Sequence, residues 1–189
     1  MKVWELETDR LQLRQWIDAD FPVFAELNSD PAVMQYFPKL LEPVDSDAIA
    51  EKCRQLIAER GWGFWAVSLK DTGCFIGFVG LHQPKANLPF SPCVEIGWRL
   101  HKHYWRRGFA TEAATEALRF AFEVLSLDEV VSFTARSNQP SRAVMERLGM
   151  YNTHNDFKHP DIESDHPLSE HVLYKITRSE WIKGSASKR

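Results

Sequence analysis

The chain has 189 residues, of which 44% are hydrophobic and 26% are charged, and its formal net charge is −3. This length is typical of a single domain built around one hydrophobic core, which needs no disulfide scaffold or metal to hold it together. The slight acidity argues against a protein whose whole surface binds nucleic acid or an anionic membrane, so an anionic ligand must be bound by local features.

No stretch of the sequence approaches the roughly 18 apolar residues of a membrane span, and the first residues lack the apolar core of a signal peptide. We therefore expect a cytoplasmic protein. The three cysteines, Cys53, Cys74 and Cys93, are widely spaced, which favours reduced thiols over a disulfide framework. Residues 1–182 are predicted to form one domain and residues 183–189 a disordered tail.

The first half of the chain alternates between strand and helix patterns. Leu11 and Leu13 alternate with polar residues, as expected of a half-buried strand, and the KDTG sequence at residues 70–73 is typical of a hairpin turn. Helical spacing of apolar residues, an N-cap and a terminal glycine indicate two helices before that turn. The predicted elements are a strand over 6–16, helices from Asp20 and from Asp45 or Ser46 to Gly61, and antiparallel strands over 63–69 and 74–81.

In the second half a strand, a basic loop and a long helix follow one another. Gly97 interrupts the strand, where a bulge or the close approach of a ligand would explain a glycine. Apolar residues then repeat every three or four positions, the pattern of an amphipathic helix. The predicted elements are a loop over 83–92, strands over 93–100, 129–135 and 171–177, a strand from Met150, and helices from Ala110 and over 141–148. This order predicts an α/β (α+β) domain with a mixed sheet.

The basic loop is the most informative part of the sequence. Between Glu95 and Glu112 there is no acidic residue. Unpaired N–H groups in a loop and in the first turn of a helix suit an anionic phosphate group, and Gly108 lets the backbone approach it closely. The alternative is a solvated basic loop before an ordinary helix. Four basic residues lie in this window: Arg99, Lys102, Arg106 and Arg107.

Residues 105–113, WRRGFATEA, resemble the pyrophosphate-binding loop of the GNAT superfamily of acyl-CoA-dependent N-acetyltransferases, whose pattern is (Q/R)-x-x-G-x-(G/A). Gly108 and Ala110 match this pattern, and Trp105 stands where Gln or Arg is usual, as in the RimJ/RimL-like branch. Three further segments resemble that branch in the right order: TDRLQLR at 8–14, EIGW at 95–98, and NQPSR at 138–142 leading to LGM at 148–150.

The resemblance implies a GNAT-like mixed, mostly antiparallel sheet of about seven strands, splayed at strands 4 and 5 and flanked by about four helices. Acetyl-CoA, as cosubstrate, would lie in the opening. The main chain of Trp98, Arg99 and Leu100 would run beside the pantetheine, and Asn138 would hydrogen-bond the pantetheine arm or guide the following helix. The pyrophosphate would be held by the backbone amides of Arg106, Arg107, Gly108, Phe109, Ala110 and Thr111.

Direct transfer to an amine requires a path for the ammonium proton, donors for the developing oxyanion and a proton for the leaving thiolate. Many relatives use a Tyr as the thiolate's proton donor, at the position that Met145 occupies here. The branch implies Ser141 in that role, although Ser141 could equally be the N-cap of its helix. Glu95 is the candidate base or ammonium-orienting residue, and a structural ion pair with Arg99 on the same strand face is the alternative.

Other chemical signals are weaker. The histidines at 101, 103, 154, 159, 166 and 171 match no common zinc spacing, so we expect no metal, although one from the late loop could enter the acceptor site. Cys93 could carry an acyl group, but a cysteine on an apolar strand more often only packs. Aromatic residues that could line the acceptor site, or belong to the core, are Tyr36, Phe37, Trp62, Phe64 and Trp65.

The sequence therefore predicts an acetyl-CoA-dependent N-acetyltransferase that acts on a primary amine, either a protein N-terminal amine or a small molecule. The alternative is a non-catalytic acyl-CoA-binding sensor or scaffold. The expected partners are acetyl-CoA and an amine acceptor, without nucleic acid or membrane, and the expected assembly is a monomer or homodimer.

Overall fold

The computed structural model describes residues 2–85 and 87–186 and consists of two compact units. The first unit comprises the chain up to Leu81 together with Gly97–Ala117, and the second comprises His82–Ile96 together with the chain from Leu118 on. The boundaries fall inside strand β5 (Glu95–Leu100) and helix α3 (Phe109–Arg119), so each of these elements contributes to both units.

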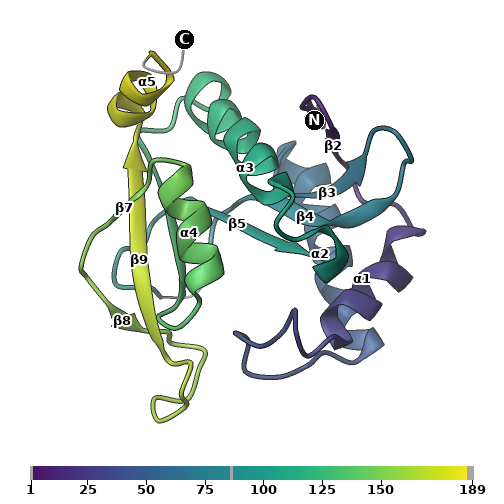
Figure 1. Cartoon of the computed structure of the whole chain (residues 1–189), viewed down its shortest axis with the longest axis horizontal. Coiled ribbons are helices and arrows are strands. Elements are labelled where there is room, and N and C mark those ends of the chain that lie inside the picture. The colour runs from purple at the N-terminus through teal and green to yellow at the C-terminus, as the bar shows by residue number, and fades with distance from the viewer. Residues whose placement is uncertain (1, 86, 187–189) are drawn as a thin grey trace. The chain divides into compact units, whose positions relative to one another are not determined.

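Successive antiparallel strands build the sheet of the first unit. Its strands are hydrogen-bonded in the order β1-β2-β3-β4-β5, with β1 to β4 antiparallel in pairs. Two helices precede β3, and a short 3-10 turn, η1 (Lys102–Tyr104), follows β5 (Figure 1). The elements not yet given are β1 (Leu6–Glu7), β2 (Leu11–Arg14), α1 (Asp20–Ser29), α2 (Pro43–Arg60), β3 (Phe64–Leu69) and β4 (Phe75–His82).

Aromatic side chains form the core of the first unit. The ring of Trp16 meets that of Phe24 edge-on at 5.0 Å between centroids, and Phe24 packs at 5.9 Å on Phe78. The indole N–H of Trp16 donates to the carbonyl oxygen of Phe64 at 2.7 Å, so the polar tip of this buried ring is satisfied. These contacts fix α1 against β3 and β4.

The second unit is built on the long antiparallel pair β6 (Glu129–Ala135) and β9 (Glu170–Thr177), paired from Glu129↔Thr177 to Ala135↔His171. The start of β5 pairs parallel with β6 at Glu95↔Val131. Two short strands, β7 (Tyr151–Asn152) and β8 (Phe157–Lys158), pair with β9. Helix α4 (Gln139–Arg147) lies alongside this pair, and α5 (Arg178–Ala186) continues from the end of β9 (Figure 1).

The strands and helices lie close to where the sequence predicts them, with three differences. Residues 6–16 form two short strands of a hairpin, because Thr8–Arg10 make a turn in which the Thr8 hydroxyl accepts from the Leu11 N–H. Helix α2 begins at Pro43, which suits a first helical position, rather than at Asp45 or Ser46. In the described ranges the sheet has nine strands in place of about seven, since the early and late strands are split.

The end of the chain also differs from a wholly irregular tail. Helix α5 extends through Ala186 and so includes residues 183–186, whereas residues 187–189 lie outside the described residues. Within the described ranges, no helix is both long enough and apolar enough to cross a membrane.

A close backbone contact joins β4 to β5. A Cβ added at Gly77, whose φ is +134°, would stand 2.1 Å from the carbonyl oxygen of Arg99 and 2.8 Å from the Cα of Leu100. No side chain fits there without moving β5. At Gly97 the nearest atom to an added Cβ is in the Phe64 ring at 3.3 Å, so a packed side chain explains this glycine.

We expect Gly77→Ala to lower the free energy of unfolding by about 2–4 kcal/mol, because β4 and β5 must separate to admit the methyl group. Gly73→Ala is the matched control: its φ of +71° imposes backbone strain, but an added Cβ meets no atom within 4 Å, and we expect a loss of about 1 kcal/mol. Urea unfolding measures both values. Equal losses in the two variants would show that the close contact with β5 does not matter.

Candidate active site

The loop between β5 and α3 has an unusual backbone conformation. Arg106 (φ +58°) and Gly108 (φ +81°) both lie in the left-handed region, two positions apart. The indole N–H of Trp105 donates to the carbonyl oxygen of Leu100 at 2.8 Å and holds the loop to the end of β5. A non-glycine residue in this region carries strain, and such strain is concentrated at ligand-binding segments.

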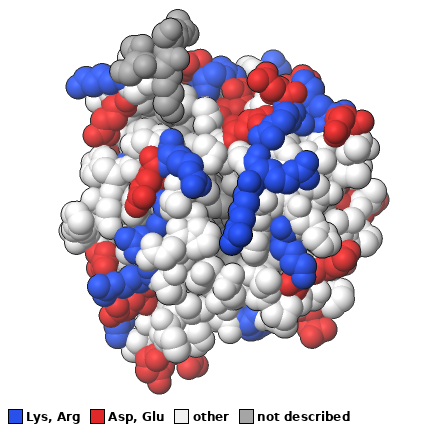
Figure 2. Space-filling view, in the orientation of Figure 1, with Lys and Arg blue, Asp and Glu red and all other residues white. Residues whose placement is uncertain are grey.

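Six consecutive backbone N–H groups in this loop, from Arg106 to Thr111, donate to no acceptor among the described residues. The first intrahelical bond at this end runs from the Glu112 N–H to the Gly108 carbonyl at 2.9 Å. Free N–H groups at a helix N-terminus carry partial positive charge and form a binding site for anions. In Figure 2, basic side chains gather over the start of α3, so side-chain charge reinforces this field.

An ion pair holds this loop in place. The Arg10 guanidinium contacts the Glu112 carboxylate at 2.6 Å and also donates to the carbonyl oxygen of Arg107 at 3.1 Å. The Thr8 hydroxyl donates to the same carboxylate at 2.6 Å. Burial acts to raise the pKa of Glu112, but the hydrogen bonds from Thr8 and Arg10 outweigh it and lower that pKa. The β1–β2 turn therefore positions the loop.

Sequence reasoning missed this network. In the sequence, Glu112 is notable only as the end of an acid-free window, and Thr8 and Arg10 only as part of a segment that resembles the GNAT branch. One signal could have indicated the network. A glutamate in the first turn of a helix is stabilised by the positive end of the helix dipole, and an arginine can form an ion pair with it there. However, Arg10 and Glu112 are far apart in the sequence, so the sequence does not indicate which arginine forms this ion pair.

Glu95, the first residue of β5, has a strongly perturbed carboxyl group. Burial raises the pKa of Glu95 to about 8. The ion pair with Arg99 that strand alternation allows is not found among the described residues: the Arg99 guanidinium instead donates to the side-chain oxygen of Asn28 at 2.6 Å. A carboxyl group whose pKa lies near neutral pH is suited to accept and release protons.

The start of α4 assigns different roles to Asn138 and Ser141. Asn138 is the N-cap, and its side-chain oxygen accepts from the Ser141 N–H at 3.2 Å, while its amide donates to the Thr134 hydroxyl at 2.8 Å. The interpretation of Ser141 as the cap is therefore wrong, because Asn138 occupies that position. The Ser141 hydroxyl has no hydrogen bond within the part of the chain that the structure describes. Met145 is buried.

The predicted site residues fall into both units. Trp98, Arg99 and Leu100 lie in the first unit together with residues 106–111. Glu95, Asn138 and Ser141 lie in the second unit. Within the first unit, η1 links the end of β5 directly to the free N–H groups at the start of α3. Of the candidate aromatics, Trp65 is a core residue whose indole N–H donates to the Trp4 carbonyl, and Phe37 is 37% exposed.

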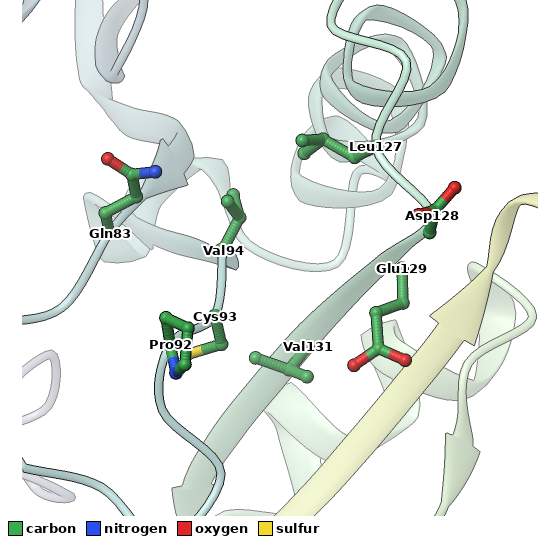
Figure 3. Close-up of a pocket in the computed structure, with 8 residues that line it drawn as sticks. All are labelled: Gln83, Pro92, Cys93, Val94, Leu127, Asp128, Glu129 and Val131. Carbon is green, nitrogen blue, oxygen red and sulfur yellow. The ribbon is translucent and has the colours of Figure 1, made fainter.

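A cavity of about 270 Å³ lies in the second unit beside Cys93 (Figure 3). Burial, with the nearby carboxylates of Glu95 and Glu129, raises the pKa of the Cys93 thiol to about 11. A thiol with this pKa is protonated at neutral pH and is a poor nucleophile. Besides Cys93 and Glu129, the cavity is lined by Gln83, Pro92, Val94, Leu127, Asp128 and Val131.

The late histidines form an aromatic cluster. His171 packs at 5.1 Å from the ring of His159 and at 5.7 Å from that of Phe157. Burial lowers the pKa of His171 to about 4, so this side chain is neutral at physiological pH. No group of three or more His, Cys, Asp or Glu side chains within residues 2–85 and 87–186 is placed to hold a metal ion.

Comparison with known proteins places these features in a family. A family model described as an acetyltransferase (GNAT) domain matches residues 10–151. The uncharacterized N-acetyltransferase YnaD of Bacillus subtilis is 28% identical over 177 residues, which cover 93% of this chain and 98% of YnaD. The FsC-acetyl coenzyme A-N(2)-transacetylase of Aspergillus fumigatus is 38% identical over 90 residues, 48% of this chain and 38% of the relative.

Solved structures agree. The crystal structure of an acetyltransferase from Agrobacterium tumefaciens has a TM-score of 0.75 at 28% identity, and the match covers 93% of this chain and 95% of that one. The prediction of an α/β domain with a mixed, mostly antiparallel sheet is confirmed, with five α-helices in the described ranges. The chain belongs to the GNAT superfamily, in its RimJ/RimL-like branch, and is an N-acetyltransferase.

Proposed function

We propose that this enzyme moves the acetyl group of acetyl-CoA to a primary amine by direct attack of the amine on the thioester. The observation that carries the proposal is the row of free backbone N–H groups at residues 106–111, beside two arginines and at the start of a helix. The pyrophosphate of coenzyme A carries several anionic oxygens, and a row of free N–H donors is suited to bind them.

The strand before the loop and the start of α4 are assigned to the pantetheine part of acetyl-CoA. The main chain of Trp98, Arg99 and Leu100 would run beside the pantetheine, and a backbone amide there would polarise the thioester carbonyl. Asn138 would act by fixing the start of α4, since its side-chain oxygen and amide are both already bonded within the protein. In this proposal the loop binds the charged pyrophosphate, and the strand positions the thioester.

The proton transfers are assigned to two side chains. Glu95 would accept the proton that the ammonium group loses, because a base with a pKa of about 8 is matched to an amine near neutral pH. Ser141 would donate to the leaving thiolate, since its hydroxyl is not used in capping. Cys93, with its raised pKa, would carry no acyl intermediate.

Release of the coenzyme A thiol from acetyl-CoA, followed with a panel of protein-like and small amines, tests the function. We expect at least one amine to accelerate thiol release and to gain the mass of one acetyl group. If no amine accelerates release while acetyl-CoA still raises the melting temperature, the transferase function is excluded for these acceptors and a binding module remains.

Gly108→Asp should raise the Kd for acetyl-CoA by roughly 10- to 100-fold, because it places a negative charge among the free N–H groups. Gly73→Asp is the matched control, since it adds the same side chain at a similar φ of +71° in a hairpin turn where an added Cβ meets no atom. Calorimetric titration with acetyl-CoA measures both. An unchanged Kd in Gly108→Asp would refute the loop assignment.

Glu95 makes a prediction about pH. In the wild type kcat/KM should rise between about pH 6 and about pH 9 as Glu95 ionises, and the difference between wild type and Glu95→Gln, measured with one acceptor, should titrate near pH 8. Glu170→Gln is the control, because Glu170 forms an exposed ion pair with Arg136.

Unfolding measurements check the same pKa without activity. The folded pKa of Glu95 is raised, so between the ordinary pKa of 4.5 and about 8 the folded state binds more protons than the unfolded state. Stability contributed by this group is therefore present at low pH and declines as pH rises through that window. The decline should be smaller in Glu95→Gln; identical profiles would contradict the raised pKa.

Ser141→Ala should lower kcat by about 10- to 100-fold and leave the Kd for acetyl-CoA unchanged, because only the thiolate that forms during the reaction needs the hydroxyl proton. Ser137→Ala, an exposed serine just before the cap, is the control. Steady-state kinetics with a saturating acceptor measure the effect. A kcat equal to that of the wild type would remove Ser141 from the mechanism.

A further inference from the structure

The Arg99 side chain, on β5, is a charged group without a charged partner. Its Nη1 donates to the Asn28 side-chain oxygen at 2.6 Å, and its Nε is buried with no hydrogen bond. The structure gives Nη2 no acceptor within the described residues, and no carboxylate there forms an ion pair with Arg99. Burial lowers the pKa of Arg99 to about 10, which leaves the guanidinium charged at neutral pH.

The guanidinium is held by neutral side chains. Asn28 of α1 is fully buried, and its amide donates to the Ser46 hydroxyl of α2 at 2.9 Å, which turns its oxygen toward Arg99. The ring of Phe37 stacks over the guanidinium at 4.1 Å, and that of Phe78 lies at 5.6 Å. These groups hold the orientation of the guanidinium but do not neutralise its charge.

Acidic side chains at the two ends of α1 do not supply the missing charge. Asp20 is paired with Arg14 at 2.7 Å, and Asp30 with Lys102 at 2.6 Å. A buried guanidinium with only a neutral partner is costly, and the cost is offset when an anion binds to its free edge. Nε and Nη2 lie on one edge and together match the two oxygens of a carboxylate.

We propose that Arg99 anchors a carboxylate of the acceptor, so that the substrate class of this enzyme is amines that also carry a carboxylate. This inference rests on the proposed function, which assigns the main chain around Arg99 to the uncharged pantetheine and the phosphates to residues 106–111. The anion that reaches the Arg99 side chain then belongs to the acceptor. The ring of Phe37, which stacks over the guanidinium at 4.1 Å, is 37% exposed and so lies at the protein surface.

Acid and amide pairs of one amine test the proposal directly. The panel is glycine, β-alanine, 4-aminobutyrate and 6-aminohexanoate, each beside its primary amide, which keeps the size and the amine but removes the carboxylate charge. We expect the wild type to prefer at least one acid over its amide by about 10- to 100-fold in kcat/KM. If the wild type acetylates these amines but prefers no acid over its amide, the proposal is overturned.

Variants assign the preference to the side chain. Arg99→Gln should raise the KM for the preferred acid about 10- to 100-fold and leave the KM for its amide unchanged, while Arg99→Lys, which keeps the charge but loses the fork, should be intermediate. Arg54→Gln, which removes an arginine paired with Asp18 at 2.6 Å, is the matched control. A rise in the KM for acetyl-CoA alone would assign Arg99 to the cosubstrate and overturn the proposal.

Binding without turnover separates this inference from the proposed function. The N-acetylated form of the preferred acid should bind the wild type in calorimetry, and both Arg99→Gln and removal of the carboxylate should weaken it. If none of the acids is acetylated, N-acetyl-6-aminohexanoate serves as the probe. Arg99-dependent binding without turnover excludes these acids as acetyl acceptors but supports a carboxylate site at Arg99. Binding that is absent or independent of Arg99 overturns the proposal. If the variants do not fold, the wild-type comparison of acid with amide decides.

Discussion

The structure around the site depends on the ion pair between Arg10 and Glu112. A loop with two left-handed residues and six free N–H groups would be costly to order by itself, because these backbone donors gain no bond to any residue that the structure describes. Arg10 offsets this by joining the end of the loop to the first turn of α3: its guanidinium contacts the Arg107 carbonyl and the Glu112 carboxylate. The free donors are thereby fixed in place before any ligand arrives, so binding does not have to supply that ordering.

Two glutamates show how the fold sets chemistry by environment. Glu112 receives hydrogen bonds from Thr8 and Arg10, which lower its pKa and favour its charged form, so its role is structural. Glu95 is half-buried without a pairing cation among the described residues, and the loss of solvation raises its pKa to about 8. The same side chain is thus a fixed charge in one place and a group that exchanges protons near neutral pH in the other. The sequence alone cannot distinguish these roles, because the two glutamates lie at the two ends of the same acid-free segment.

Local patterns predict this fold well where the decisive interaction lies within a few residues. The hairpin at 70–73, the helix that ends at Gly61 and the loop before α3 all follow from neighbouring residues and are found where expected. The pairing of Arg10 with Glu112 and of Arg99 with Asn28 joins residues far apart in the chain, and no periodicity specifies such partners. Ser141 shows a further limit. Serine is a favoured N-cap residue in general, but here Asn138, three residues earlier, is the N-cap of this helix.

The character of the acceptor depends on a local charge rather than on the average one. A net charge of −3 favours cationic ligands in general, yet the buried guanidinium of Arg99 favours an anion at one position. An apolar pocket distinguishes related amines only weakly, whereas a site built to bind a charged group leaves that group unpaired when the wrong ligand enters. Selectivity at Arg99 would therefore come as much from rejection of uncharged amines as from attraction of the carboxylate. The neutral Asn28 and Phe37 sharpen this selection, because neither can replace the missing negative charge.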